Sequence, residues 1–268
     1  MVYDPLATIN PEDFFEDNNF GRGRKKKTRK SRLTHSTRSP IVQNNLELKS
    51  IFPKSENQKT AFEDYEDGKN LLLHGIAGTG KTFIGVYLAM RDLKDKVDGV
   101  KKVVIVRSAV ASRDQGFLPG GIAEKSAVYE APYKSIFSEL FGRDDSYELL
   151  KKRREVEFIT TSFIRGITIN NAVVIVDEVQ NMSAQELHTI ITRLGKNTKL
   201  ILCGDHRQDD LTGKKGEVSG LKDIIRVLVS MGTMTKIEFE MGDIQRSPFV
   251  KEYLIQRLKL GLDKPLDI

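Results

Sequence analysis

The chain has 268 residues but only one cysteine, Cys203, so it cannot form an internal disulfide bond. It also lacks any apolar run close to the roughly 20 residues that a membrane-spanning helix requires. The opening stretch MVYDPLATINPEDFF has neither the basic nor the apolar segment of a secretory signal peptide. These absences argue against a disulfide scaffold, a membrane protein and a secreted protein, and they predict a location in the reducing cytoplasm.

The composition is that of an ordinary globular protein, with 39% apolar and 30% charged residues. A chain of this length can bury one sizeable α/β core with some residues left over. No internal repeat is present, and the one low-complexity segment lies near the N-terminus. We therefore expect a single folded domain at residues 46–268, preceded by an arm at residues 1–45.

Charges in this arm are segregated along the sequence. The first seventeen residues carry only acids, and nine Lys and Arg residues then follow, from Arg22 to Arg38, with no acid among them. Because the arm has few apolar side chains to offset the entropy of ordering, we expect it to be disordered in the free protein. A dense basic run also suits binding to a phosphate backbone through counterion release. The alternative is a solvated tail that aids solubility or pairs with its own acidic start.

From about residue 50 onward, short apolar runs alternate with amphipathic stretches. This pattern predicts a mainly parallel sheet flanked by helices, which is an α/β fold. The predicted strands cover residues 71–74, 103–106, 157–160, 172–176, 200–203 and 236–239. The predicted helices cover residues 81–93, 184–194, 221–230 and 248–259.

The first chemical motif matches the pattern G-x-x-x-x-G-K-[ST] of phosphate-binding loops. It consists of Gly75, Ile76, Ala77, Gly78, Thr79, Gly80, Lys81 and Thr82. Its glycines let the backbone aim N–H groups at phosphate oxygens, and the following helix adds the positive end of its dipole. Lys81 would reach the β- and γ-phosphates, and the Thr82 hydroxyl would bind Mg²⁺. The motif predicts binding of a nucleoside triphosphate; the alternative is a glycine-rich turn with an accidental Lys-Thr pair.

The second motif is the apolar run 172–176, which leads directly into Asp177 and Glu178. A buried strand in a parallel sheet delivers such acids to the edge where ligands bind. Asp177 would hold Mg²⁺ through its water shell, and Glu178 would act as the general base for the attacking water. Taken alone, the same pattern is typical of a strand that ends in a solvated turn.

A third strand end carries the sequence from Cys203 to Gln208. The Gln208 amide offers both a donor and an acceptor, so it could sense the γ-phosphate and help to place the water. Alternatively, Asp205 caps a turn and Gln208 is exposed. Cys203 is predicted to be an unreactive core residue because its neighbours are apolar.

Several of these stretches together resemble the PhoH family of P-loop ATPases, which are relatives of the superfamily 1 helicase core. The matching stretches, found between residues 55 and 260, are GIAGTGKT, VRSAVASRDQGFLPGG, VVIVDEVQN, GDHRQDDL, VSGL and DIQRSPFV. The resemblance implies a RecA-like ATPase domain at residues 46–268 that uses ATP and Mg²⁺. It also implies association with RNA, helicase activity and assembly into homo-oligomeric rings, with a hexamer as the expectation.

The resemblance assigns roles to further residues. Gln58 matches a glutamine that reads adenine, although without the family it is a polar residue at a helix start. Arg107 stands in the place of a segment that contacts nucleic acid, but Ser108 replaces the proline that often follows there. Arg107 could instead support the ATP site or form a salt bridge at the end of its strand.

Arg246 lies two residues before Pro248, in a stretch that resembles the start of the second motor domain of superfamily 1 helicases. In those motors the arginine brings positive charge to the γ-phosphate. The sequence given ends about twenty residues later, so we expect Arg246 to serve either its own site or that of a neighbour in a ring. A structural salt bridge on the last helix is the alternative.

Residues 120–155 have no clear motif. Lys125, Tyr129, Tyr133, Lys134 and Phe137 could line a channel for single-stranded nucleic acid, or they could belong to an amphipathic helix. Two functions are therefore predicted: an ATP-driven enzyme that moves on or remodels RNA or single-stranded DNA, and an ATP-gated binding or scaffold protein without unwinding activity.

Overall fold

The computed structural model describes residues 46–108, 122–205 and 221–261. The predicted arm at residues 1–45 therefore lies outside the described residues, as does Gln208. Within the described ranges, no helix has the length and apolar character needed to cross a membrane.

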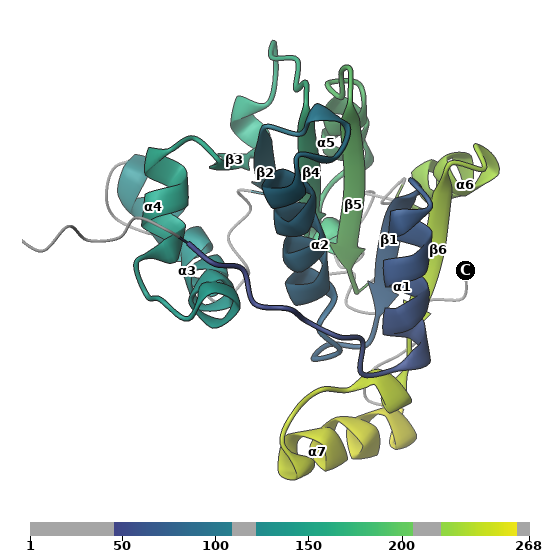
Figure 1. Cartoon of the computed structure of the whole chain (residues 1–268). Helices are drawn as coiled ribbons and strands as arrows, with labels where there is room; N and C mark the ends of the chain where they lie inside the picture. The colour runs from purple at the N-terminus through teal and green to yellow at the C-terminus, as the bar shows by residue number, and fades with distance from the viewer. Residues whose placement is uncertain (1–45, 109–121, 206–220, 262–268) are drawn as a thin grey trace, which may run out of the picture. The chain divides into compact units, whose positions relative to one another are not determined.

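A sheet of six parallel strands forms the centre of the fold, in the order β3-β2-β4-β5-β1-β6 (Figure 1). The strands are β1 (Asn70–Gly75), β2 (Lys102–Arg107), β3 (Val156–Thr160), β4 (Ala172–Asp177), β5 (Thr198–Gly204) and β6 (Met234–Phe239). All six correspond to predicted strands. Because the strands are parallel, their carboxyl ends meet at one edge, toward which the arrows of β5 and β6 point in Figure 1.

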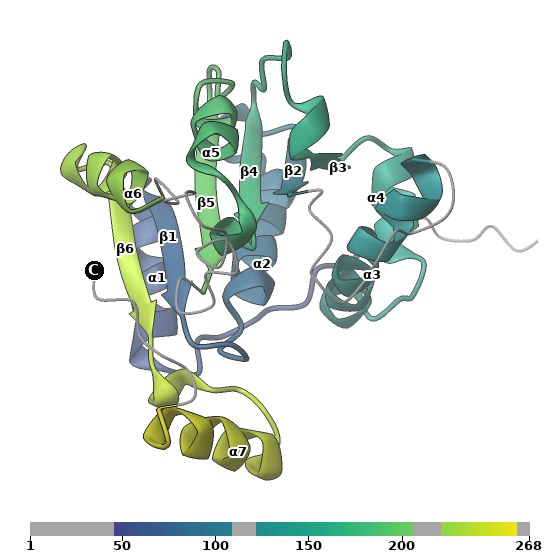
Figure 2. The ribbon, with the colours of Figure 1, turned by 180° about the vertical axis from the view of Figure 1, so that it is seen from behind.

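Helices cover both faces of this sheet, as the RecA-like class predicts. They are α1 (Glu56–Glu66), α2 (Lys81–Asp95), α3 (Ile122–Phe141), α4 (Ser146–Lys152), α5 (Ala184–Ile191), α6 (Leu221–Ser230) and α7 (Pro248–Lys259). One core cluster joins the sheet to α1, α2, α3 and α4, and a second joins it to α5 and α6. Figure 1 shows α1 and α2 before the sheet, and Figure 2 shows α5 and α6 on the opposite side.

The four predicted helices correspond to α2, α5, α6 and α7, and α5 ends three residues earlier than predicted. A capping box fixes its start: the Ser183 hydroxyl accepts a hydrogen bond from the Glu186 N–H, and the Glu186 carboxylate accepts one from the Ser183 N–H. The helices α1, α3 and α4 lie outside the four predicted ranges, although a helix start at Gln58 and an amphipathic helix within residues 120–155 are among the alternatives that the sequence offers. In α3, Pro132 lies inside the helix and interrupts the pattern by which a helix is recognised.

Two of the aromatic residues of α3, Tyr133 and Phe137, do not line an open channel. Tyr133 and Phe137 are fully buried in the core, so they cannot stack on bases. Lys134 forms an ion pair with Glu148 of α4. The amphipathic-helix interpretation of this segment is therefore the right one for these residues.

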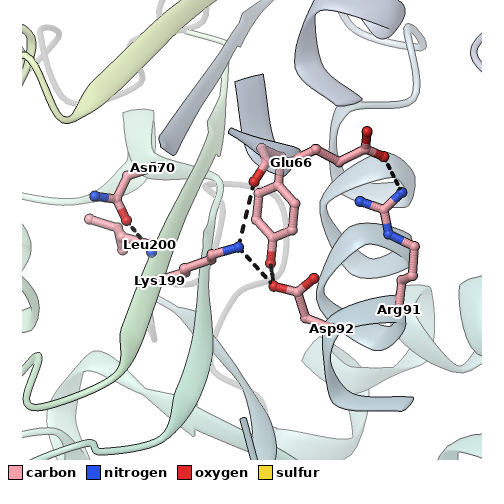
Figure 3. A network of polar contacts seen from close by, with 7 residues as sticks. Glu66, Asn70, Arg91, Asp92, Lys199 and Leu200 are labelled. Atoms are coloured by element: carbon pink, nitrogen blue, oxygen red, sulfur yellow. Dashed lines mark hydrogen bonds and ion pairs between the residues drawn. The ribbon is translucent and has the colours of Figure 1, made fainter. Parts of the chain in front are cut away.

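A buried polar network ties α1, α2 and β5 together (Figure 3). The Tyr65 hydroxyl donates to Asp92 Oδ2 at 2.9 Å, and Lys199 Nζ donates to the same oxygen at 3.0 Å. The Lys199 ammonium also lies 4.2 Å from the centre of the Tyr65 ring. Burial, and then the nearby charge of Asp92, raise the pKa of Tyr65 well above its ordinary value, so its hydroxyl remains a donor.

Replacing Asp92 with alanine is expected to lower the free energy of unfolding by about 3 kcal/mol, because the Lys199 ammonium would lose its carboxylate partner in an enclosed site. Urea unfolding measures this value. The matched control is Glu66→Ala, which breaks the ion pair between Glu66 and Arg91; Glu66 is more than half exposed, so that change should cost under about 1 kcal/mol. Equal losses from the two substitutions would contradict the structural role of the network.

Candidate nucleotide-binding site

A cavity of about 650 Å³ opens at the carboxyl edge of the sheet. Its walls come from the loop after β1, from α1 and α3, from the ends of β2, β4 and β5, and from the segment before α7. Gln58, Lys81, Asp177, Glu178 and Arg246 all line it. The structure thus gathers most of the predicted site residues around one cavity.

The loop from Gly75 to Thr82 joins β1 to α2 and depends on its glycines. Gly75 has a φ of +117°, and a Cβ there would lie 2.2 Å from the carbonyl oxygen of Phe239. Gly78 and Gly80 also have positive φ, at +80° and +86°. Since Gly80 gives α2 no side-chain cap, the first N–H groups of this helix are left for another acceptor.

The Lys81 side chain folds back over this loop. Its ammonium is almost fully buried and donates to the carbonyl oxygens of Gly75 at 2.8 Å and Ile76 at 2.7 Å. Burial lowers the pKa of Lys81, against the opposing effect of nearby acids such as Asp205. Among the described residues, no carboxylate forms an ion pair with this ammonium within 4 Å. A buried cation beside uncapped N–H groups suits a phosphate anion, so the residues present fit the triphosphate of ATP.

Asp177, at the end of β4, is held on both carboxylate oxygens. The Thr82 hydroxyl donates to Oδ1 at 2.8 Å and the Tyr133 hydroxyl donates to Oδ2 at 2.8 Å. Burial raises the pKa of Asp177, the charge of Glu178 raises it further, and these two hydrogen bonds act in the opposite direction. The described ranges contain no cluster of three or more metal-binding side chains. Thr82 and Asp177 fit Mg²⁺, which takes one or two protein ligands and completes its shell with phosphates and water.

Glu178 has the left-handed backbone conformation, with φ 55° and ψ 47°. Its carboxylate accepts a hydrogen bond from the Gln180 side-chain amide, whose oxygen accepts one from the Asp205 N–H at 2.9 Å. Gly204 makes room for this link, because a Cβ there would lie 2.7 Å from the Gln180 oxygen. Gln180 was not identified from the sequence. Its position two residues after Glu178, in the turn that follows β4, is the pattern that could have indicated a contact with that carboxylate.

Gln58 lies in the first turn of α1, which Ser55 caps. Its side-chain oxygen accepts a hydrogen bond from the Lys54 N–H at 2.7 Å, and its amide nitrogen donates to the Thr79 carbonyl at 3.2 Å. The amide is nearly buried at the cavity wall. Gln58 therefore joins the segment before α1 to the phosphate-binding loop.

The two predicted arginines also face this cavity. Arg246 packs on the loop of its own chain: a Cβ at Gly78 would lie 3.1 Å from Arg246 Cγ, and the Gln245 N–H donates to the Gly78 carbonyl at 3.0 Å. Arg107 ends β2 and lies 5.8 Å from the centre of the Tyr129 ring. Among the described residues, neither arginine forms an ion pair with a carboxylate within 4 Å.

The parallel sheet and the glycine-rich loop after β1 define a P-loop NTPase with a RecA-like fold. The chain belongs to the PhoH family, because the model of the family described as PhoH-like protein matches residues 50–256.

The relatives support the same assignment. The chain is 34% identical to a PhoH-like protein of Bacillus subtilis over 216 residues, which are 80% of this chain and 66% of that protein. It is 32% identical to the protein PhoH of Escherichia coli, over 80% of this chain and 60% of that protein. The chain thus spans less than two thirds of the length of these relatives. Among solved structures, a SWI2/SNF2 ATPase core of Sulfolobus solfataricus in complex with double-stranded DNA aligns with a TM-score of 0.42 and 12% identity, over 82% of this chain and 55% of that one.

Proposed function

We propose that this chain binds and hydrolyses ATP at the cavity around Lys81. The buried Lys81 ammonium, which has no carboxylate partner among the described residues, is the observation that carries this proposal. In this proposal Lys81 and the N–H groups of the loop bind the phosphates, and Gln58, which lines the cavity, reads the adenine base. Thr82 and Asp177 would hold Mg²⁺, which would supply positive charge to the phosphate oxygens.

The remaining proposed site residues have separate roles in hydrolysis. Glu178 accepts the proton of the attacking water as general base, and the hydrogen bond from Gln180 orients its carboxylate. Arg246 lies on the loop and offsets the negative charge that develops during phosphoryl transfer. Gln208 is the proposed γ-phosphate sensor.

The proposal extends to RNA or single-stranded DNA as the partner and to a homo-oligomeric ring as the working assembly. The basic run from Arg22 to Arg38 provides the charge for backbone binding, and Arg107 lies at the cavity, where a bound polymer could influence hydrolysis. The proposed division into an arm at residues 1–45 and an ATPase domain at 46–268 follows from the same charge pattern. The second candidate is an ATP-gated binding protein that separates no strands.

RNA or single-stranded DNA is expected to raise ATP turnover by about tenfold, which corresponds to a decrease of about 1.4 kcal/mol in the activation free energy. Turnover is measured with and without each polymer, beside strand separation on a tailed duplex. Stimulation with separation supports the motor, and nucleotide-dependent binding without separation supports the second candidate. No effect of either polymer on ATP turnover or binding would contradict both.

The arm can be tested by replacing Lys25, Lys26 and Lys27 with alanine and measuring polymer affinity at several salt concentrations. Each lost contact with a single-stranded backbone reduces the magnitude of the slope of log affinity against log salt by about 0.7, so this magnitude should be smaller by about 2 in the triple variant. The control removes equal charge from Lys101, Lys152 and Lys196, which lie close to the amino ends of β2, β3 and β5. Equal slopes for the two triple variants would show that the arm holds no polymer.

A further inference from the structure

Tyr133 is a fully buried residue of α3 that reaches the carboxylate at the end of β4. Its hydroxyl donates to Asp177 Oδ2 at 2.8 Å, while the Thr82 hydroxyl donates to Oδ1 at 2.8 Å. The two oxygens of Asp177 are therefore distinguished by their partners. Oδ1 lies beside Thr82, the other proposed metal ligand, and Oδ2 is occupied by the tyrosine.

The Tyr133 side chain is fixed by its surroundings. It has no exposed surface, and its ring packs against Phe158 of β3 with the ring centres 5.7 Å apart. Phe137, one turn later on α3, is also fully buried and packs against Tyr147 of α4. The hydroxyl is therefore presented to Asp177 by a packed core and not by a mobile side chain.

The same helix also contacts the neighbouring strand end. Tyr129 lies one turn before Tyr133, and its ring faces the Arg107 guanidinium at 5.8 Å. Arg107 and Asp177 are paired residues in the register of β2 and β4. Two tyrosines on successive turns of α3 thus contact the last residues of two adjacent strands. These last residues, Arg107 and Asp177, both line the nucleotide cavity.

We propose that Tyr133 is a positioning residue for metal binding, and this inference rests on the function proposed above. By holding Oδ2, it prevents rotation of the Asp177 carboxylate and leaves Oδ1 to face the metal together with the Thr82 hydroxyl. Partners that orient a metal ligand in this way commonly change metal affinity or activity by about 10- to 100-fold when they are removed.

The test is Tyr133→Phe, which removes only the hydroxyl. The matched control is Tyr147→Phe, because Tyr147 is equally buried and its hydroxyl donates to another carboxylate, Glu130 Oε2, also at 2.8 Å. Binding of Mn²⁺ is measured by electron paramagnetic resonance in the presence of a non-hydrolysable ATP analogue. We expect Mn²⁺ affinity to fall about tenfold in Tyr133→Phe and to stay near the wild-type value in Tyr147→Phe.

A second readout separates positioning from general packing. Binding of the same analogue in EDTA depends on Lys81 and the loop, so Tyr133→Phe should leave it unchanged, and excess Mg²⁺ should restore most of the turnover. Unchanged Mn²⁺ affinity, or an equal loss in both tyrosine variants, would overturn the role of Tyr133. If the wild-type protein binds neither the analogue nor Mn²⁺ with it, the proposed function fails, and the role of Tyr133 fails with it.

Discussion

Glu178→Gln is expected to lower ATP turnover by about 10²- to 10⁴-fold, which is the usual contribution of a general base. The amide keeps the shape of the side chain but cannot accept a proton from water. ATP binding should stay close to the wild-type value, because Lys81 and the phosphate-binding loop are unchanged. Phosphate release gives the turnover, and equilibrium binding of a fluorescent ATP analogue gives the affinity.

Six of the described non-glycine residues have a positive φ, and of these only Glu178 lines the nucleotide cavity. Its left-handed conformation costs a residue with a Cβ about 1 to 3 kcal/mol, and such strain tends to occur at functional sites. The strained turn aims the carboxylate at the cavity, where Gln180 donates to it.

A matched control for this substitution is Glu186→Gln on α5. Its carboxylate is also hydrogen-bonded, by Thr161 and Ser183, but it does not line the nucleotide cavity. Without polymer, Glu186→Gln should change turnover by less than about twofold, since it removes no group that contacts ATP. Turnover of Glu178→Gln within tenfold of the wild type would show that another group acts as the base.

The strand and loop positions that the sequence predicted depend on local patterns. The apolar run of β4 ends at Asp177 because a strand buried on both faces needs apolar side chains throughout, and the ligand edge begins where they stop. The loop around Lys81 is equally local, since its glycines, lysine and threonine are consecutive. Strand positions and loop placement therefore required no knowledge of tertiary contacts.

The parts that the sequence did not predict depend on contacts between distant residues. Tyr133 reaches Asp177 across 44 residues, from a helix whose internal Pro132 hides its pattern. The link from Gln180 to the Asp205 N–H requires β5 to lie beside β4, and strand order is not encoded by periodicity. Tyrosine and glutamine occur in protein cores, on surfaces and in binding sites, so residue type alone could not assign Tyr133 and Gln180 to the site.

Arg246→Ala is expected to lower turnover by about 10³-fold or more, the range seen when an arginine that neutralises a transferring phosphoryl group is removed. The effect should fall on turnover and not on ATP affinity, because the charge that Arg246 offsets develops in the transition state. Lys251→Ala serves as a control, because it removes a cation from α7. This helix begins two residues after Arg246 and does not line the cavity. A loss of less than tenfold would contradict a direct role for Arg246.

The position of Arg246 also predicts which subunit it serves. Its side chain packs on Gly78 of the same chain, and the Gln245 N–H donates to the Gly78 carbonyl, so we expect it to act on its own site. Mixing Arg246→Ala with Lys81→Ala tests this expectation, because each variant retains the residue that the other lacks. If the arginine acts within its own chain, the mixture stays as inactive as its components. If it acts across a ring interface, a lysine-deficient subunit lends its arginine to a neighbour and turnover returns. Recovered turnover would therefore show that the arginine acts on the site of a neighbouring subunit. Continued inactivity, in subunits shown to exchange, would show that each chain supplies the arginine of its own ATP site.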